Sequence, residues 1–562
     1  MTVPSSSLSD TSPAEVSKQI KALIKELPEI RADAARLDDL RRIFTRLEAE
    51  GELSFGTPPP KSPVAAKWHA FLHKSHKTMV SQLCDRVQLG RHSAIRCLWG
   101  VIAGSPLTKQ QQGNSSSSSP SYKYMNVDLL QKWMRAMIRQ ESTHMDNGMK
   151  NMVEGEFFRP FRDVQYYSLG SITALATAAY NNEGCNDQKT AEKLLELLMM
   201  VPVPSSAEDL EGNSQYLFSP PVDAIPDEVD DAESDEDSQA IEEESDEDSS
   251  DDESESDGHE QGNVTREESG RPQKRRKLEN RKFSFQRMRM FRREYQKAWL
   301  AVLRLDLPVG SLKQALHFLP KNVLSYVSHP LRFSDFFMQA YSDHELGVIG
   351  VLALDGLFLL MTEYGLEYPN FYKQLYKLVS AKVLYAKYRT RFFSLLNKCL
   401  IRNEMLPAYL VAAFIKRLCR CGLNAPPSAA LFVLALVSNL LRKHPECNCL
   451  VQRKEGTAME DLFAAEEDDP VECRALQSSL WELAVYERHY YPAVATLAKS
   501  IGREEEAKAP PHIIDDFAGH TYASLFSQEK KKKTKTALTF KEPASLFTED
   551  DIFSGCLEIG SS

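Results

Sequence analysis

Cations and aromatic side chains alternate in one C-terminal stretch, a combination suited to contacts with phosphate groups. Residues 371–443 hold thirteen Lys or Arg and a single acid, whereas residues 333–370 hold six acids and no Lys or Arg. A basic segment between acidic ones suits the phosphates of a nucleic acid or an acidic segment of a partner protein. We therefore predict contact with RNA or with an acidic partner at nine residues: Lys382, Lys387, Arg389, Arg391, Lys416, Arg417, Arg420, Arg442 and Lys443.

Part of this basicity has a second explanation, because several of these cations lie at expected helix C-termini. The helix dipole favours positive charge there. This explanation covers Lys416, Arg417, Arg442 and Lys443. It does not account for the missing acids, so the predicted contact with an anionic partner stands beside it.

Aromatic residues near these cations are candidates for a partner interface. The candidates are Tyr385, Tyr388, Trp481, Tyr490 and Tyr491. We expect Trp481 to lie with Leu480, Ala484 and Val485 on one apolar helix face. Such a tryptophan is interpreted as a core or interface anchor rather than part of a ligand site.

An acidic run and a basic run follow one another in the middle of the chain. Residues 227–257 hold nineteen Asp or Glu and no Lys or Arg, and residues 271–304 hold thirteen Lys or Arg and two Glu. The formal net charge is −11, so the chain outside the acidic run is basic. A block of like charges stays solvated and disordered. A basic remainder points to an anionic partner, with nucleic acid as the first candidate.

Two short signals accompany these runs. The basic tetrapeptide Lys274, Arg275, Arg276 and Lys277 predicts a nuclear localisation signal. Ser234 and Ser245 each precede Asp-Glu-Asp, the pattern that acid-directed kinases use, and phosphorylation would deepen the negative charge. A generic solvated charge run and an unmodified polyanion are the alternative interpretations.

Motifs for catalysis or metal binding are scarce in the sequence. It contains no Walker A phosphate loop, no GxGxxG, no GxSxG and no HExxH. The pairs Cys419/Cys421 and Cys447/Cys449 could supply four zinc thiolates, but a one-residue spacing is not the usual one for zinc. We interpret them as reduced thiols and predict no cofactor, no metal and no enzymatic activity.

The longest apolar stretch is Leu346–Met361, sixteen residues that include Asp355. A membrane-spanning helix needs about eighteen or more apolar residues, so we predict a buried core helix here. The Ser-rich opening lacks the pattern of a signal peptide. We therefore expect a protein that is not secreted and whose cysteines are reduced.

Serial amphipathic helices must position all of these residues. Apolar side chains recur at helical spacing over residues 14–49, 64–103, 122–146, 160–181 and 187–201, and again on three faces after residue 371. Helices of this kind, joined by short turns, predict an all-α fold. The expected architecture is an irregular α-solenoid of HEAT- or armadillo-like helix pairs, interrupted by a long disordered acidic insert.

Four regions are expected along the chain. They are an N-terminal helical region (1–202), a disordered acidic and basic linker (203–278), a C-terminal helical domain (279–505) and an extended tail (506–562).

The C-terminal half resembles the CCAAT-binding-factor/nucleolar-complex family of helical domains. The resemblance covers about residues 310–527 and is carried by the segments 406–417, 426–433, 479–483, 489–494 and 521–526. The family often has His-Tyr-His-Pro where this chain has His489-Tyr490-Tyr491-Pro492. Tyr491 can keep only part of any polar role of that second His.

The resemblance implies a non-enzymatic nucleolar scaffold for biogenesis of the small ribosomal subunit. It implies an obligate pair with nucleolar protein fourteen, other proteins of the small-subunit processome as partners, and contact with pre-ribosomal RNA, direct or indirect. A scaffold of this kind acts by binding, because stacked helices offer a long surface for a partner's extended segment. The alternatives are a DNA-associated transcription regulator and a transport-receptor-like helical adaptor.

Overall fold

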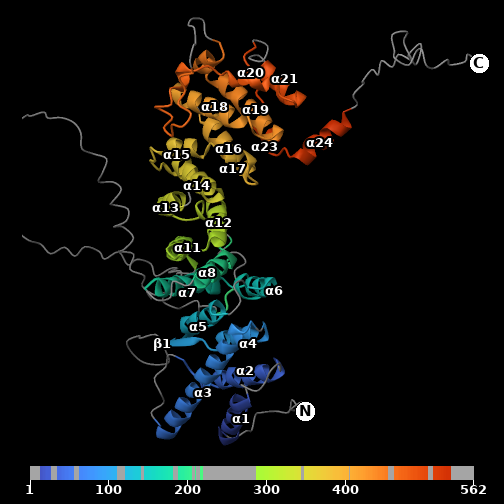
Figure 1. Ribbon diagram of the computed structural model, residues 1–562. Coiled ribbons are helices and arrows are strands. Elements are labelled where there is room, and N and C mark those ends of the chain that lie inside the picture. The colour runs from blue at the N-terminus through green and yellow to red at the C-terminus, as the bar shows by residue number, and fades with distance from the viewer. Residues whose placement is uncertain are drawn as a thin grey trace, which may run out of the picture. The chain divides into compact units, whose positions relative to one another are not determined.

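A computed structural model of the chain shows two compact units, Met1–Glu367 (unit 1) and Tyr368–Ser562 (unit 2) (Figure 1). It describes residues 13–26, 34–55, 62–90, 92–110, 121–140, 145–181, 188–205, 209, 215–218, 286–343, 347–403, 405–452, 461–503 and 510–532. These residues are overwhelmingly helical, so the predicted all-α class is confirmed.

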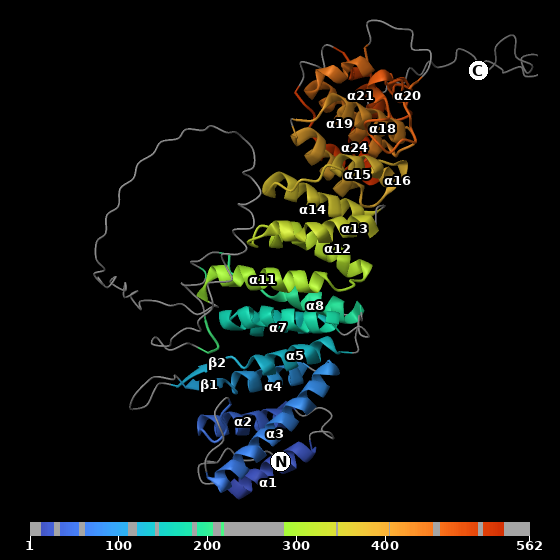
Figure 2. The same cartoon turned by 90° about the vertical axis from the view of Figure 1, so that its left-hand side faces the viewer.

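Unit 1 consists of successive helices and one short hairpin. The elements are α1 (Pro13–Glu26), α2 (Ala34–Ala49), α3 (Pro63–Gln88), α4 (His92–Ala103), β1 (Leu107–Gln110), β2 (Ser121–Tyr124), α5 (Val127–Ile138), α6 (Asn147–Met152), η2 (Val153–Phe158), α7 (Arg162–Asn181), α8 (Gln188–Met200), α11 (Met288–Leu303), α12 (Val309–Phe318), η5 (Leu319–Val323), η6 (Pro330–Phe333), α13 (Ser334–Asp343) and α14 (Val348–Tyr364). Each helix packs mainly on its near neighbours in this order, from α3 on α4 and α5 to α13 on α14 (Figure 2). Within unit 1 this stacking is compatible with the predicted irregular solenoid.

The helix stack of unit 1 continues across the charged middle of the sequence. α11, the first described helix after residue 218, packs along α7 and also contacts α8. The packing thus divides the chain near residue 367, while the domain limits predicted at 202 and 279 remain sequence-based predictions.

A two-stranded hairpin departs from the predicted helix over residues 122–146. β1 pairs antiparallel with β2, with Leu107 opposite Tyr124, and α5 starts only at Val127. The Asn126 side chain accepts a hydrogen bond from the Leu129 amide, 3.3 Å away, and caps the first turn of α5.

Buried lysine side chains bind carbonyl groups at the ends of other elements. In unit 1 the Lys193 ammonium is buried and donates to the carbonyl oxygens of Ile138, at 3.1 Å, and Gln140. Ile138 is the last residue of α5, whose final carbonyls have no partner inside the helix. The cation therefore satisfies groups that burial would otherwise leave without a hydrogen bond.

The apolar stretch predicted as a core helix forms α14. Nine of its residues are buried, from Ile349 to Leu360. A Cβ on Gly356 would overlap the Phe337 ring of α13, so glycine is needed for this close helix contact. Among the described residues, no helix reaches the length and apolarity required to cross a membrane.

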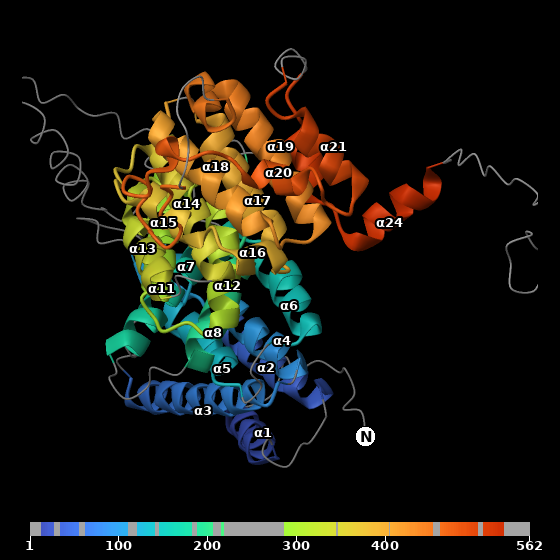
Figure 3. The ribbon, with the colours of Figure 1, turned by 45° about the horizontal axis from the view of Figure 1, so that its top comes forward.

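Unit 2 is built around one central helix. Its elements are α15 (Phe371–Leu378), α16 (Ala381–Tyr385), α17 (Arg389–Leu396), η7 (Asn397–Arg402), α18 (Ala408–Gly422), α19 (Pro427–Lys443), η8 (Pro445–Leu450), η9 (Ala475–Gln477), α20 (Glu482–Tyr486), α21 (Pro492–Ser500), α23 (Ile514–Ala518) and α24 (Tyr522–Lys531) (Figure 3). Every residue of α19 from Pro427 to Leu441 is buried. α18, α21 and α23 pack around α19, and the Phe432 ring stacks on Phe393 at 3.7 Å between centroids. A helix that is apolar all round is typical of a core.

Several sequence predictions concern residues outside the described ranges. The acidic insert, the basic tetrapeptide Lys274–Lys277 and the phosphorylation candidates Ser234 and Ser245 all lie there.

The buried His76 of α3 predicts a pH-dependent stability of unit 1. Its ring lies against Phe44 and Phe55 and is 3.3 Å from the Ser105 hydroxyl. Burial, with smaller contributions from His73 and Lys132, lowers the pKa of His76 from 6.5 to about 4. Below pH 6.5 the unfolded chain therefore binds more protons than the folded one. We expect the free energy of unfolding to fall by about 3 kcal/mol between pH 7 and pH 4 from this group alone.

Urea denaturation at several pH values between 7 and 4 would measure the slope of the free energy of unfolding against pH. Tryptophan fluorescence reports on unit 1, because four of the five tryptophans lie there: Trp68, Trp99, Trp133 and Trp299. His76→Phe keeps a ring between Phe44 and Phe55 but cannot titrate, so its slope should be markedly smaller. His92→Asn, at an exposed position, is the matched control and should keep the wild-type slope. Equal slopes in all three proteins would contradict the assignment.

Candidate functional site

The nine cations predicted to contact an anionic partner divide into two groups in unit 2. Three of them, Lys382, Lys387 and Arg391, are exposed, and none of the three has an ion-pair partner in the described part of the chain. The other six bind groups within unit 2. The sequence pattern therefore overstated the number of cations that a partner can reach. Composition does not show which cations are buried or which bind groups within unit 2.

Lys416 shows this most clearly, because its side chain is fully buried. Its Nζ lies 3.0 Å from Glu482 Oε2, and both side chains are 0% exposed. The same ammonium lies 3.1 Å from Asp461 Oδ2 and donates to the Ser479 carbonyl at 2.6 Å. These bonds join α18 to α20 and to the segment that precedes α20. Lys416 has no surface left for RNA or for an acidic partner, which departs from the prediction.

Arg420 and Trp481 extend this ionic cluster to the surface. Arg420 Nη1 lies 3.4 Å from Glu482 Oε1, and its guanidinium lies 4.7 Å from the centre of the Trp481 ring. The Lys416 ammonium is 5.4 Å from the same ring. Cations in these positions interact favourably with the face of an indole. Trp481 is thus held in place while 39% of its surface stays exposed.

Asp461 completes the cluster by accepting several hydrogen bonds. Trp481 Nε1 donates to Asp461 Oδ2 at 2.8 Å, and the Ser478 hydroxyl donates to the other oxygen. Burial alone would raise the pKa of this carboxyl, but hydrogen bonds from Ser478, Trp481 and Lys416 lower the pKa to about 2. The carboxylate is therefore charged at neutral pH and balances the two cations together with Glu482.

Arg417 fills a similar internal role next to this cluster. It donates to the carbonyls of Val379 and Glu467, each at 2.9 Å, and its guanidinium stacks 4.3 Å from the Tyr376 ring centre. It also forms an ion pair with the exposed Asp468 at 3.3 Å. Arg417 thus joins the end of α15 to the segment around residue 467.

The remaining three cations bind backbone carbonyls of distant segments. Lys443 donates to Ile401 and Asn403 at 2.5 and 2.8 Å, Arg442 to Pro510 at 2.7 Å, and Arg389 to His520 at 2.8 Å. Lys443 and Arg442 do lie at the C-terminus of α19, as the helix-dipole explanation expected. Their hydrogen bonds, however, fasten other parts of unit 2 onto α19.

The apolar helix face predicted from Leu480, Trp481, Ala484 and Val485 is wrong. The buried residues of α20 are Glu482, Leu483 and Tyr486, while Val485 is 48% exposed. Glu482 is drawn inward by the buried Lys416 ammonium, and the Tyr486 hydroxyl donates to the Cys419 carbonyl at 3.1 Å. A charged pair thus orients this helix more strongly than its apolar pattern.

The other aromatic candidates lie at the surface or near it. Tyr490 is 76% exposed and stacks on His489 at 4.4 Å between centroids. Tyr385 is exposed and its hydroxyl donates to the Asn424 carbonyl. Tyr491 donates to Glu529 Oε1 at 3.0 Å, and Tyr388 is half-buried. Their role as a partner interface remains a prediction.

The paired cysteines bind different backbone groups. The thiols of Cys421, Cys447 and Cys449 donate to the carbonyls of Val379, Ala408 and Leu476, respectively. Cys419 is fully buried, and burial raises the pKa of its thiol. In the described ranges, no group of three or more His, Cys, Asp or Glu is arranged to hold a metal ion.

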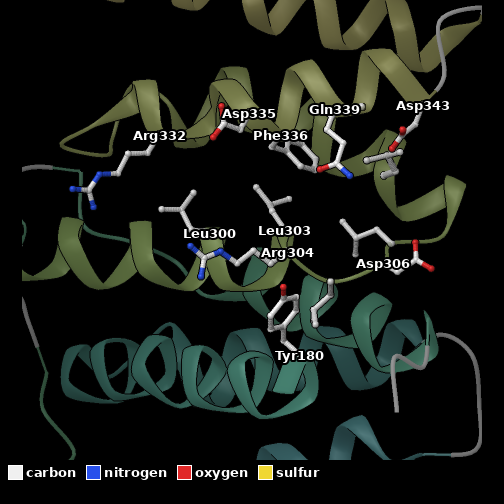
Figure 4. A pocket seen from close by; sticks show the side chains of 14 residues that line it. Tyr180, Leu300, Leu303, Arg304, Asp306, Arg332, Asp335, Phe336, Gln339 and Asp343 are labelled. Atoms are coloured by element: carbon white, nitrogen blue, oxygen red, sulfur yellow. The ribbon is translucent and has the colours of Figure 1, made fainter. Parts of the chain in front are cut away.

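A groove in unit 1 was not anticipated from the sequence. It has a volume of about 900 Å³ and lies between α11 and α13, with Tyr180 of α7 beside it. Figure 4 shows Leu300, Leu303 and Phe336 between the two helices, with Arg332 toward one end and Asp343 toward the other. No motif marks these residues, because they come from α7, α11, α12, η6 and α13 and meet only in the folded unit.

Comparison with known proteins identifies part of the chain. Residues 350–498 match the model of the CBF/Mak21 family. The family resemblance stated from the sequence is confirmed over this range. The matched residues include the Lys416–Glu482 pair and the exposed cations Lys382, Lys387 and Arg391.

Individual relatives extend this similarity across animals and plants. Nucleolar complex protein 4 homolog of Gallus gallus is 40% identical over 267 residues, which is 46% of this chain and 51% of that protein. Nucleolar complex protein 4 homolog of Homo sapiens is 41% identical over 244 residues, 43% of this chain and 46% of that protein. Protein NUCLEOLAR COMPLEX ASSOCIATED 4 of Arabidopsis thaliana is 37% identical over 286 residues, 46% of this chain and 49% of that protein. The chain thus spans about half the length of the curated relatives it matches.

The buried Lys416–Glu482 pair predicts a strong and non-additive effect of mutation. Glu482→Leu leaves the Lys416 ammonium buried with Asp461 as its remaining carboxylate, and should destabilise unit 2 by about 3–5 kcal/mol. The double variant Lys416→Met with Glu482→Leu removes both buried charges and should be less destabilised than Glu482→Leu alone. Urea denaturation of the full chain, with hydrogen exchange in residues 461–486, would measure both.

The surface pair between Lys373 and Asp469 supplies the control for this test. Lys373 Nζ lies 2.9 Å from Asp469 Oδ2, and the two side chains are 43% and 25% exposed. Because exposed ion pairs contribute little, Lys373→Met should change the stability of unit 2 only slightly. A Glu482→Leu variant as stable as Lys373→Met would show that the buried pair does not support unit 2.

Proposed function

From the CBF/Mak21 domain that residues 350–498 carry, we propose that this protein is a nucleolar scaffold for ribosome biogenesis that acts by binding and not by catalysis. The observation that carries the proposal is the similarity, at 37–41% identity, to proteins named for the nucleolar complex in a bird, a human and a plant. The basic tetrapeptide Lys274–Lys277 supports a nuclear and nucleolar location.

The finer proposal places the protein in assembly of the small ribosomal subunit. There it pairs with nucleolar protein fourteen, joins other proteins of the small-subunit processome and contacts pre-ribosomal RNA during processing and subunit maturation or export. The family resemblance supports this placement, and the exposed cations of residues 382–391 supply positive charge for an anionic partner.

We place the protein partner on the surface formed by Trp481 and Val485. An exposed tryptophan with a fixed orientation is a typical interface anchor, since little side-chain freedom remains to be lost on binding. Trp481 meets this condition because Asp461, Lys416 and Arg420 already hold its ring. Val485 lies one turn further along α20 and is also exposed.

Affinity purification of the tagged chain from nuclear extract, with and without ribonuclease, tests this function. We expect one stoichiometric large partner that survives ribonuclease, together with small-subunit precursor RNA that ribonuclease removes. This outcome would establish a scaffold held by protein contacts. Recovery of chromatin factors without pre-ribosomal material would contradict the proposal and favour a transcription regulator.

The same purification tests the proposed partner surface. Val485→Asp places a charge beside Trp481 and should lose most of the ribonuclease-resistant partner. Val471→Asp adds the same charge at another exposed valine of unit 2 and should retain the partner. Equal recovery with both variants would rule out the surface at Trp481 and Val485.

A further inference from the structure

Three segments far apart in the sequence meet on one side of unit 2. The Arg389 guanidinium donates to the His520 carbonyl at 2.8 Å, which joins the start of α17 to the start of α24. The Tyr491 hydroxyl donates to Glu529 at 3.0 Å, which joins the turn before α21 to the end of α24. Residues 382–391 and 489–491 are therefore both linked to residues 520–532, and we call these three segments together the aromatic platform.

Four aromatic rings stand exposed on the aromatic platform. Tyr385, Tyr490, Tyr522 and Phe526 are 59%, 76%, 62% and 72% exposed. Tyr522 and Phe526 are four residues apart on α24, and so share one face of that helix. Burial raises the pKa of Tyr490, as do the neighbouring phenols of Tyr522 and Tyr385, in agreement with their closeness. A cluster of exposed rings on one surface is typical of a binding site.

Positive charge lies on two of the three segments that carry these rings. The three segments hold seven Lys or Arg and one acid, Glu529. Glu529 is already engaged by Lys532, at 2.5 Å, and by Tyr491. Lys382, Lys387 and Arg391 are exposed on the first segment, and Lys530 and Lys531 on α24. The aromatic platform therefore carries exposed cations that no acid of its own segments is shown to pair with.

We propose that the aromatic platform binds single-stranded RNA. Unpaired bases would stack on Tyr490 and Tyr522, and the phosphates between them would lie against Lys387 and Arg391. Exposed rings interleaved with cations are the arrangement by which proteins hold single strands without reading their sequence. The proposal rests on the proposed function and gives its RNA contact a place.

RNA rather than a protein is the favoured occupant because of the charge pattern. A protein interface typically has an apolar centre from which lysine is depleted. On the aromatic platform, cations lie on the same segments as the rings, and this arrangement suits a ligand that offers flat rings and negative charge at a regular spacing.

The test uses the purified full chain and a fluorescein-labelled single-stranded RNA of mixed sequence, about 20 nucleotides long, followed by fluorescence anisotropy. Tyr490→Ala with Tyr522→Ala should weaken binding about thirtyfold or more, since each stacked base contributes at least roughly 1 kcal/mol. Lys387→Ala with Arg391→Ala should lower the slope of log affinity against log salt by roughly 1.4. A duplex of the same length should show little effect of the tyrosine substitutions, because its bases are already stacked.

Matched controls separate local effects from general ones. Tyr409→Ala removes another exposed ring of unit 2, and Lys313→Ala with Lys321→Ala removes two exposed charges of unit 1. Both controls should bind the single strand with wild-type affinity. Thermal unfolding of every variant checks that the substitutions leave the fold intact, as expected at exposed positions.

Three outcomes would overturn the proposal. One is a wild-type chain that does not bind the RNA, and another is equal loss of affinity in the tyrosine variant and the Tyr409→Ala control. The third is loss of the ribonuclease-resistant partner by the tyrosine variant with unchanged RNA affinity, which would make the aromatic platform a protein interface. Because the RNA assay contains no partner protein, its failure leaves the scaffold function to be judged by the purification alone.

Discussion

The buried ion pair between Lys416 and Glu482 is the constraint on which the arrangement of unit 2 depends. Two charges removed from water are tolerated only when each has a close partner and further hydrogen bonds. Lys416 meets this requirement with Glu482, Asp461 and the Ser479 carbonyl, which lie in segments about 45 to 66 residues further along the chain. The position of α20 against α18 therefore follows from satisfying one ammonium group. The exposure of Trp481 and Val485 follows in turn, because the pair draws Glu482 and its side of α20 inward.

Much of the basic character of residues 371–443 serves the interior of unit 2. Arg417, Arg442 and Lys443 donate to carbonyl groups of segments that have no regular backbone partner at those positions. Buried carbonyls need donors, and long cationic side chains can reach them across several ångströms while keeping part of their length in contact with apolar groups. Of the nine cations predicted to reach a partner, Lys382, Lys387 and Arg391 face solvent, and they lie on the segment that carries the exposed Tyr385.

Unit 1 relies on a different kind of packing, in which each helix rests on its near neighbours. This arrangement explains why α11 can resume the stack after the long charged stretch of the sequence, since α7 and α8 already present the surface that it covers. It also brings Arg304 and Asp306, at the end of α11, into the groove with α13. The two units thus combine a stack of local contacts with a core held by long-range ionic and hydrogen bonds.

Local sequence patterns predicted the helical class and most helix positions, and short motifs predicted the resemblance to the family whose model matches residues 350–498. Helices such as α18 and α19 could be predicted because apolar periodicity and proline positions are local signals. The folded structure was needed to show which cations are buried, which face of α20 points inward and which distant segments meet at the aromatic platform. These outcomes depend on pairing between residues tens of positions apart, such as Lys416 with Glu482 or Arg389 with His520. A sequence pattern shows that a residue is charged, but it does not show which partner that residue binds when it is buried.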